Sequence, residues 1–136
     1  MTSFQAQSTA QPQAISALTA RVEDFLQSAG VDARATYHVA LLIEELMTNL
    51  GTHGGVPGEQ ATILVTVHPN DVRVELRDRG PPFDPRSVPE PDLTSSIKDR
   101  QLGGLGLYLL RKLATEIEYM RRGEHNDTRF TVRRWS

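Results

Sequence analysis

The sequence predicts an α+β fold in which helices cover one face of an antiparallel-rich sheet. Apolar residues near the start of the chain recur every three or four positions, which is the spacing of a buried helical stripe. In the middle of the chain they recur at every second position, which is the spacing of a strand. The strands follow one another in hairpins and do not alternate strictly with helices, so the pattern favours α+β over an alternating α/β arrangement.

Two helices are expected first. The first runs from Pro12 with its apolar residues on one stripe, and Gly30 can end it. Asp32 can cap the second, whose apolar surface is wide enough for a mostly buried helix over residues 33–50. A glycine-rich segment that suits neither helix nor strand follows.

Four or five strands and a third helix complete the prediction. Period-two alternation places strands over residues 63–67, 72–76, 116–121 and 128–134. The last pair flanks a predicted turn with the sequence GEHND, and the third helix should begin after Gly104. Residues 1–11 are polar and form either a tail or a short edge strand around residues 3–7.

Composition narrows the class of protein. The chain has 136 residues, no cysteine and a formal net charge of −2. This length fits one domain, and the near balance of charge gives no reason to expect nucleic acid or an anionic membrane as partner. The N-terminus lacks the features of a secretion signal, and no stretch approaches the roughly 20 apolar residues of a membrane span. We therefore expect a cytoplasmic protein that binds neither membrane nor nucleic acid.

The first candidate site is the stretch EELMTNLGTHGG at the end of the second helix. Glu45 and Asn49 lie four residues apart and so share a helical face, which His53 would extend if the helix continues. An amide oxygen and a carboxylate suit a hard cation such as Mg²⁺, and Glu45 could instead act as a general base. The alternative is that all three are ordinary exposed polar residues.

The second candidate is DRGPPFDP, at the end of a strand. Asp78 can accept a hydrogen bond from an exocyclic amine, and Gly80 permits close approach of backbone or ligand. The alternative is a turn initiated by the aspartate. The proline-rich stretch that follows, residues 79–102, is a long loop of the kind that often forms a functional lid.

The third candidate is QLGGLGLYLLRK. Gly103, Gly104 and Gly106 stand at the start of the third helix, where free amides and the helix dipole suit phosphate. Plain connectors have the same composition, and the stretch is not a Walker or Rossmann motif. Lys98 and Arg100 precede it and either reach phosphate or remain solvated loop charges.

Together the three stretches resemble the nucleotide-binding boxes of the GHKL superfamily, which includes DNA gyrase, the Hsp90 chaperone, sensor histidine kinases and the mismatch-repair protein MutL. Within it the sequence is most similar to bacterial anti-sigma factor serine/threonine kinases of the SpoIIAB and RsbW type. The resemblance implies the Bergerat fold, a two-layer α/β sandwich, over residues 12–136, with residues 79–102 as the lid over ATP.

The resemblance also implies a role for each matching residue. Glu45 would be the general base, Asn49 would contact Mg²⁺, and His53 ends the same box. Asp78 would bind the adenine amine, with Gly80 beneath the base. The remaining expected contacts are the phosphate-binding backbone at Gly103, Gly104, Leu105 and Gly106, and Thr128, which would support the aspartate.

The implied function is phosphorylation of a protein by ATP. The protein substrate would be a small anti-sigma-factor antagonist of the STAS type, the second partner would be a sigma factor, and the kinase would be a homodimer. A regulatory module that binds ATP without transferring phosphate is the alternative. Two departures from the family pattern stand out, namely Leu50 in place of a small residue and Pro82 in place of a glycine.

Overall fold

The computed structural model describes residues 2–54, 58–87 and 102–135. The elements are β1 Thr2–Ser8, α1 Pro12–Ser28, α2 Ala33–Thr52, β2 Ala61–Val67, β3 Asp71–Asp78, the short 3-10 helix η1 Pro85–Ser87, α3 Leu102–Leu113, β4 Glu116–Arg122 and β5 His125–Arg133. Of the two possibilities for the N-terminus, the edge strand is the one that forms. None of the described helices is long and apolar enough to cross a membrane.

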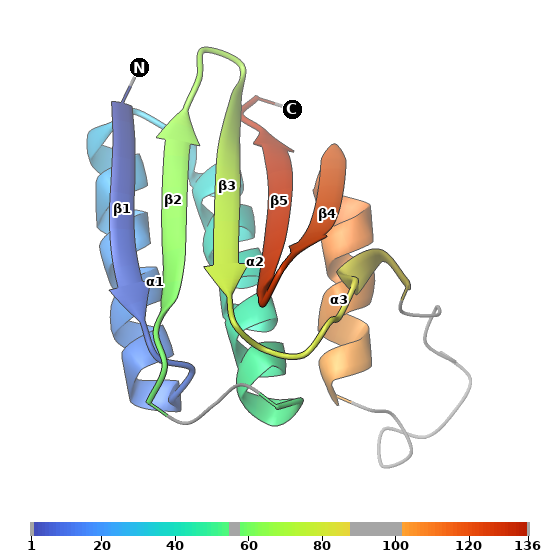
Figure 1. Ribbon diagram of the computed structural model, residues 1–136. Helices are drawn as coiled ribbons and strands as arrows, with labels where there is room; N and C mark the ends of the chain where they lie inside the picture. The colour runs from blue at the N-terminus through green and yellow to red at the C-terminus, as the bar shows by residue number, and fades with distance from the viewer. Residues whose placement is uncertain (1, 55–57, 88–101, 136) are drawn as a thin grey trace.

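The five strands form one sheet in the order β1-β2-β3-β5-β4. All pairings among the described strands are antiparallel, whereas a mixed, mostly antiparallel sheet was expected. The three long helices lie side by side against one face, with α2 in the middle (Figure 1). The predicted α+β class and the two-layer arrangement are therefore confirmed.

The first two helices begin where the sequence predicts, and each carries its predicted apolar stripe. Pro12 opens α1, and Asp32 caps α2 by accepting a hydrogen bond from the Ala35 amide at 3.1 Å. α2 continues two residues beyond the predicted end, to Thr52, and the His53 amide closes it on the Asn49 carbonyl at 2.9 Å. This extension keeps the polar residues of the first candidate site on one continuous helix.

The core lies between the helices and the sheet. Burying a large apolar side chain contributes roughly 1.5–3 kcal/mol, so this layer supplies most of the stability. The largest of the fully buried side chains come from α1, α2, α3 and the three central strands: Val22, Leu26, Val39, Leu42, Ile43, Met47, Ile63, Val65, Val72, Val74, Leu110 and Phe130.

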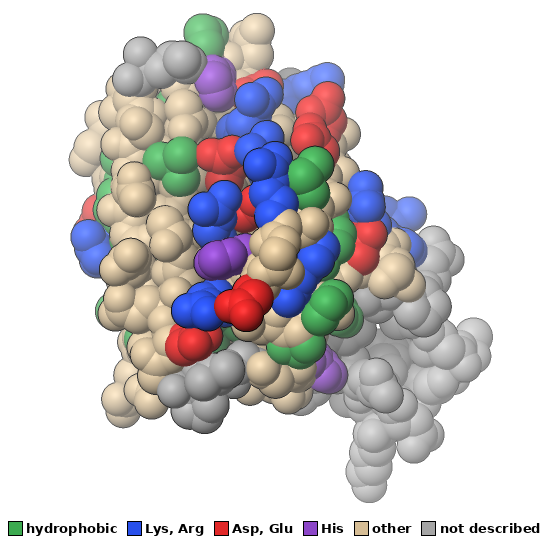
Figure 2. Space-filling model, viewed as in Figure 1, with side chains coloured by type: hydrophobic (Ala, Val, Ile, Leu, Met, Phe, Trp, Pro, Cys, Tyr) green, Lys and Arg blue, Asp and Glu red, His purple; other side chains and the backbone are tan. Residues whose placement is uncertain are grey.

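The opposite face of the sheet is polar. Figure 2 shows arginines and acidic side chains gathered together over its centre. Arg77 pairs with Asp127 at 2.8 Å, and Arg129 pairs with Glu75 at 2.8 Å. Such exposed pairs contribute little to stability. The neighbouring charges of this face therefore satisfy one another.

Two further boundaries differ from the prediction in a way that affects the candidate site. α3 begins at Leu102, so its glycines lie inside the helix and do not precede it. β5 begins at His125, because the hairpin turns at Gly123 and Glu124 alone. Gly123 adopts a φ of +57°, which suits glycine in the first position of a two-residue hairpin turn. His125, Asn126 and Asp127 are therefore strand residues.

Candidate functional site

The candidate site lies at the end of the sheet where α2 finishes, β3 ends and β5 starts. A cavity of about 40 Å³ opens there, lined by Leu46, Asn49, Leu50, His53, Leu76, Asp78, Pro81, Phe83, Pro85, Asn126 and Thr128. The fold thus brings together four of the predicted residues from three separate parts of the chain. This volume is far below the roughly 300 Å³ or more of ordinary ligand pockets, so a nucleotide base enters only if the lining moves.

Asp78 forms a turn and also keeps an acceptor for a ligand. Its Oδ1 accepts from the Gly80 amide at 2.8 Å and from Asn126 Nδ2 at 3.0 Å. Its Oδ2 has no hydrogen-bond partner among the described residues, and it is not one of their fully buried unpaired atoms. The two interpretations of DRGPPFDP are therefore compatible, because one oxygen makes the turn and the other faces open space.

Gly80 packs closely against two neighbouring side chains. A Cβ atom at this position would lie 2.9 Å from Leu50 Cδ1 and 3.1 Å from Asp78 Oδ1. Leu50, the departure noted in the sequence, fills the space that a side chain on residue 80 would need. The backbone after β3 therefore lies directly against α2.

The α2 side of the site carries polar groups without partners. Asn49 is 7% exposed, lines the cavity and makes no side-chain hydrogen bond within the described part of the chain. Glu45 lies one turn earlier, is partly buried and does not line the small cavity. Burial, followed by repulsion from Glu44, raises the pKa of Glu45 above its usual value. A carboxylate of raised pKa is better suited to accept a proton near neutral pH.

His53 and Phe83 close the cavity. Their rings stack with centroids 6.2 Å apart and planes 6° apart. The Phe83 amide donates to the Tyr119 hydroxyl at 3.2 Å, which ties this part of the loop to β4. The aromatic pair therefore joins the end of α2 to the start of the predicted lid.

The glycines expected to hold phosphate lie in the first turn and a half of α3. In a helix that begins at Leu102, the amides of Gly103 and Gly104 have no carbonyl acceptor within the helix. The Gly106 amide lies four residues after Leu102 and is used by the helix itself. The observed start of α3 favours Gly103 and Gly104 over Leu105 and Gly106 as donors. Lys98, Arg100 and the rest of residues 88–101 lie outside the described residues.

Thr128 lines the cavity from β5, paired across the sheet with Leu76 and 4% exposed. Within the described residues, no hydrogen bond joins Thr128 to Asp78. Asn126, two positions earlier on the same face of β5, makes that contact instead. The predicted support of the aspartate therefore comes from a residue that the sequence analysis did not select.

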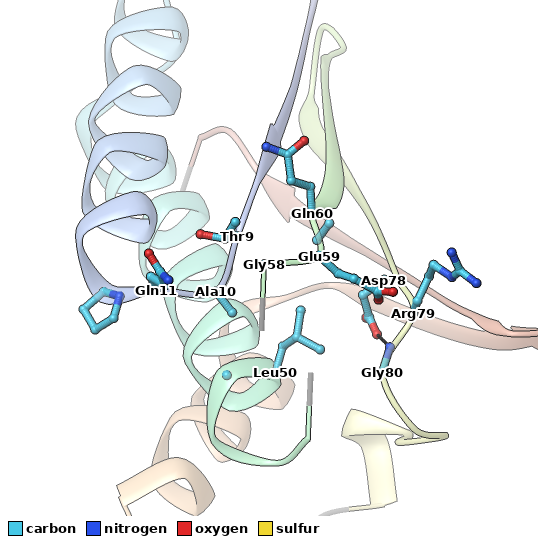
Figure 3. Close-up of a pocket in the computed structure, with 13 residues that line it drawn as sticks. Thr9, Ala10, Gln11, Leu50, Gly58, Glu59, Gln60, Asp78, Arg79 and Gly80 are labelled. Carbon is cyan, nitrogen blue, oxygen red and sulfur yellow. Dashed lines mark hydrogen bonds between the residues drawn. The ribbon is translucent and has the colours of Figure 1, made fainter. Parts of the chain in front are cut away.

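A second cavity of about 240 Å³ lies on the other side of Leu50. Figure 3 shows Leu50 extending from α2 toward the space between the β1–α1 connection and the end of β3. Leu50, Asp78 and Gly80 line both cavities. These residues therefore form the wall between the two.

The antiparallel sheet backed by helices, with Asp78 at a strand end and Asn49 on the central helix lining one cavity, fits the ATP-binding domains of the GHKL superfamily that the sequence resembles. Comparison with known proteins agrees with this class. The chain belongs to the histidine kinase-like ATPase domain family, which matches residues 8–132.

One related protein and two solved structures are similar to this chain. Serine/threonine-protein kinase BtrW of Bordetella bronchiseptica is 32% identical over 101 residues, which cover 73% of this chain and 71% of that protein. The RsbU and RsbW domain structure from Mycobacterium tuberculosis has a TM-score of 0.70 at 17% identity, over 98% of this chain and 32% of that one. The SiaB–SiaC complex from Pseudomonas aeruginosa has a TM-score of 0.60 at 11% identity, over 96% and 89%. At these identities the two structures support the fold alone.

Proposed function

We propose that the chain is an ATP-dependent kinase that phosphorylates serine or threonine on a small anti-sigma-factor antagonist. The observation that carries this proposal is Glu45, a partly buried carboxylate of raised pKa, one helical turn before Asn49 at the edge of the nucleotide site. The serine/threonine kinase named among the relatives supports the same activity.

The residues divide the reaction between recognition and proton transfer. Asp78 Oδ2 would accept a hydrogen bond from the adenine amine. The amides of Gly103 and Gly104 would donate to phosphate at the positive end of α3. Glu45 would take the proton of the acceptor hydroxyl as its oxygen attacks the γ-phosphorus, and the bond to the β,γ-bridging oxygen breaks to release ADP.

Asn49 fits a role in holding Mg²⁺. Its amide is nearly buried and makes no hydrogen bond within the described residues, so its oxygen is available as a cation ligand. The described residues contain no cluster of three or more His, Asp or Glu that would hold a metal on its own. Mg²⁺ commonly takes few protein ligands and completes its shell with water and substrate phosphates, where it neutralises charge on the phosphoryl group.

The partners belong to the same proposal. The antagonist would be a STAS-type protein, the unphosphorylated antagonist would compete with a sigma factor for the kinase, and the kinase would be a homodimer. The SiaB–SiaC complex supports a protein partner for this fold, since that neighbour is itself seen in a complex.

Transfer of labelled phosphate from Mg-ATP to the cognate antagonist tests the proposal. We expect phosphoserine or phosphothreonine with the wild type, and Glu45→Gln should lower the rate by about 100-fold or more while ATP still binds. Glu23→Gln is the matched control, because Glu23 is an exposed carboxylate on α1 and lies outside the site.

Absence of phosphorylation by the wild type would contradict the kinase assignment. An undiminished rate in Glu45→Gln would contradict the role of Glu45 as the general base. ATP binding without transfer to any antagonist would favour the alternative, a regulatory module that binds ATP and sequesters a protein.

A further inference from the structure

We propose that Asn126 is a positioning residue for adenine recognition, which orients the Asp78 carboxylate and fixes the backbone that follows it. The inference rests on the proposed binding of ATP and deepens it, because Asn126 lies outside all three sequence motifs. Asn126 lines the small cavity, but its proposed role is exerted through Asp78 and not by contact with a reacting atom.

The orientation of the Asn126 amide is determined by its neighbours. Its Oδ1 accepts from Arg121 Nη1 at 3.2 Å and from the Tyr119 hydroxyl. Arginine only donates hydrogen bonds, so the end of the amide that faces Arg121 is the oxygen. The NH₂ group must therefore face Asp78, where Nδ2 lies 3.0 Å from Oδ1.

The same NH₂ group holds the segment after β3. Pro81 and Pro82 have no backbone N–H, so these two residues can make backbone hydrogen bonds only through their carbonyl oxygens. Asn126 Nδ2 lies 2.9 Å from the Pro81 carbonyl oxygen and 3.3 Å from that of Gly80. Arg121 Nη1 adds a contact of 2.7 Å to the Gly80 carbonyl.

The Asp78 carboxylate therefore has one oxygen that accepts two hydrogen bonds and one that can accept a hydrogen bond from a ligand. Asn126 and the Gly80 amide both occupy Asp78 Oδ1, which leaves Oδ2 as the acceptor without a partner among the described residues. Asn126 is 4% exposed, so this arrangement is shielded from competing water. Without the Asn126 donor, the carboxylate is held by a single hydrogen bond, and either oxygen can turn toward the ligand.

A comparison of two nucleotides isolates this role. Purine riboside 5′-triphosphate is ATP without the 6-amino group, so it cannot donate to Asp78. We expect Asn126→Ala to weaken ATP binding by about 10-fold and to weaken binding of the analogue much less. The dissociation constant of the analogue divided by that of ATP should therefore fall toward one. Calorimetric titration of the intact chain with each nucleotide measures the ratio of dissociation constants.

Matched variants separate positioning from general loosening. Val132→Ala removes a fully buried side chain at the far end of the same strand, and it should destabilise the fold without changing the ratio. Tyr119→Phe removes only the hydroxyl that contacts Asn126 and the Phe83 amide, and it should lower the ratio by a smaller factor.

The outcomes separate this inference from the proposed function. If the wild type binds ATP and Asn126→Ala keeps its selectivity, the inference is wrong and the proposed function stands. If the wild type binds neither nucleotide, the proposed function is wrong, and the inference that rests on it is wrong as well. If Asn126→Ala does not fold, an unchanged ratio in Tyr119→Phe overturns the inference.

Discussion

The candidate site has two sides, which differ in how completely their polar groups are hydrogen-bonded. The residues of β3 and β5 form the sheet wall, and the residues of α2 form the α2 wall. On the sheet wall, Asp78 and Asn126 take part in a continuous set of hydrogen bonds that reaches Tyr119 and Arg121. On the α2 wall, the side chains of Glu45 and Asn49 make no hydrogen bond within the described residues. One wall is already assembled in the chain alone, and the other offers groups that a ligand would satisfy.

This difference assigns separate tasks to the walls. A hydrogen-bonded wall costs little to organise when the ligand arrives, which suits recognition of a fixed shape such as a purine. A wall with a carboxylate of raised pKa suits a proton transfer, because the charged form of Glu45 is not stabilised in advance. Substitutions on the sheet wall should therefore change binding, and those on α2 should change transfer.

The largest effect on binding is expected for Asp78→Asn. The new side chain keeps an oxygen for the Gly80 amide and Asn126, but it turns a donor toward the donating adenine amine. ATP affinity should fall by about 10- to 100-fold, with the fold intact.

A thermal shift with Mg-ATP is a quick measurement of the Asp78→Asn effect, since ligand at 100 times its dissociation constant adds about 2.7 kcal/mol to the wild type. An unchanged shift in Asp78→Asn would mean that this carboxylate does not contact the base.

A smaller effect, on stability, is expected for Gly80→Ala. The added methyl group would meet Leu50 Cδ1 at 2.9 Å, and such overpacking costs typically 1–3 kcal/mol. Chemical denaturation measures the loss, and Leu50→Val in the same chain should recover part of it. If the double variant is no more stable than Gly80→Ala, contact with Leu50 is not the reason for the glycine.

The smallest effect is expected from the titration of Glu45. Its raised pKa means that the folded chain binds this proton more readily than the unfolded chain, so the stability it contributes at low pH is lost as pH rises through that pKa. Glu45→Gln should therefore be more stable than the wild type at neutral pH, by less than about 1 kcal/mol because solvent screens a partly exposed group.

Unfolding curves at neutral and acidic pH measure this difference. The gain in Glu45→Gln should shrink as pH falls, and a gain that grows on acidification would mean that the pKa is not raised.

Local patterns predict most of the fold and only part of the site. Hydrophobic periodicity predicts the helices and strands, because the residues of each buried stripe are close together in the sequence. No local pattern predicts the pairing of Asp78 with Asn126, because the register between β3 and β5 creates it. Asn126 was assigned to a turn because Asn and Asp are typical turn residues. The alternation of Asn126, Thr128, Phe130 and Val132 on one face was the signal that could have shown a longer strand.

The position of Leu50 has a consequence for the design of selective reagents. Leu50 separates a cavity of about 40 Å³ from one of about 240 Å³. Leu50→Ala would remove most of that partition and merge the two spaces beside Asp78. The altered protein would then admit a purine with a bulky apolar substituent that the natural chain excludes. Such a nucleotide would report on this one kinase in a mixture of proteins that all use ATP.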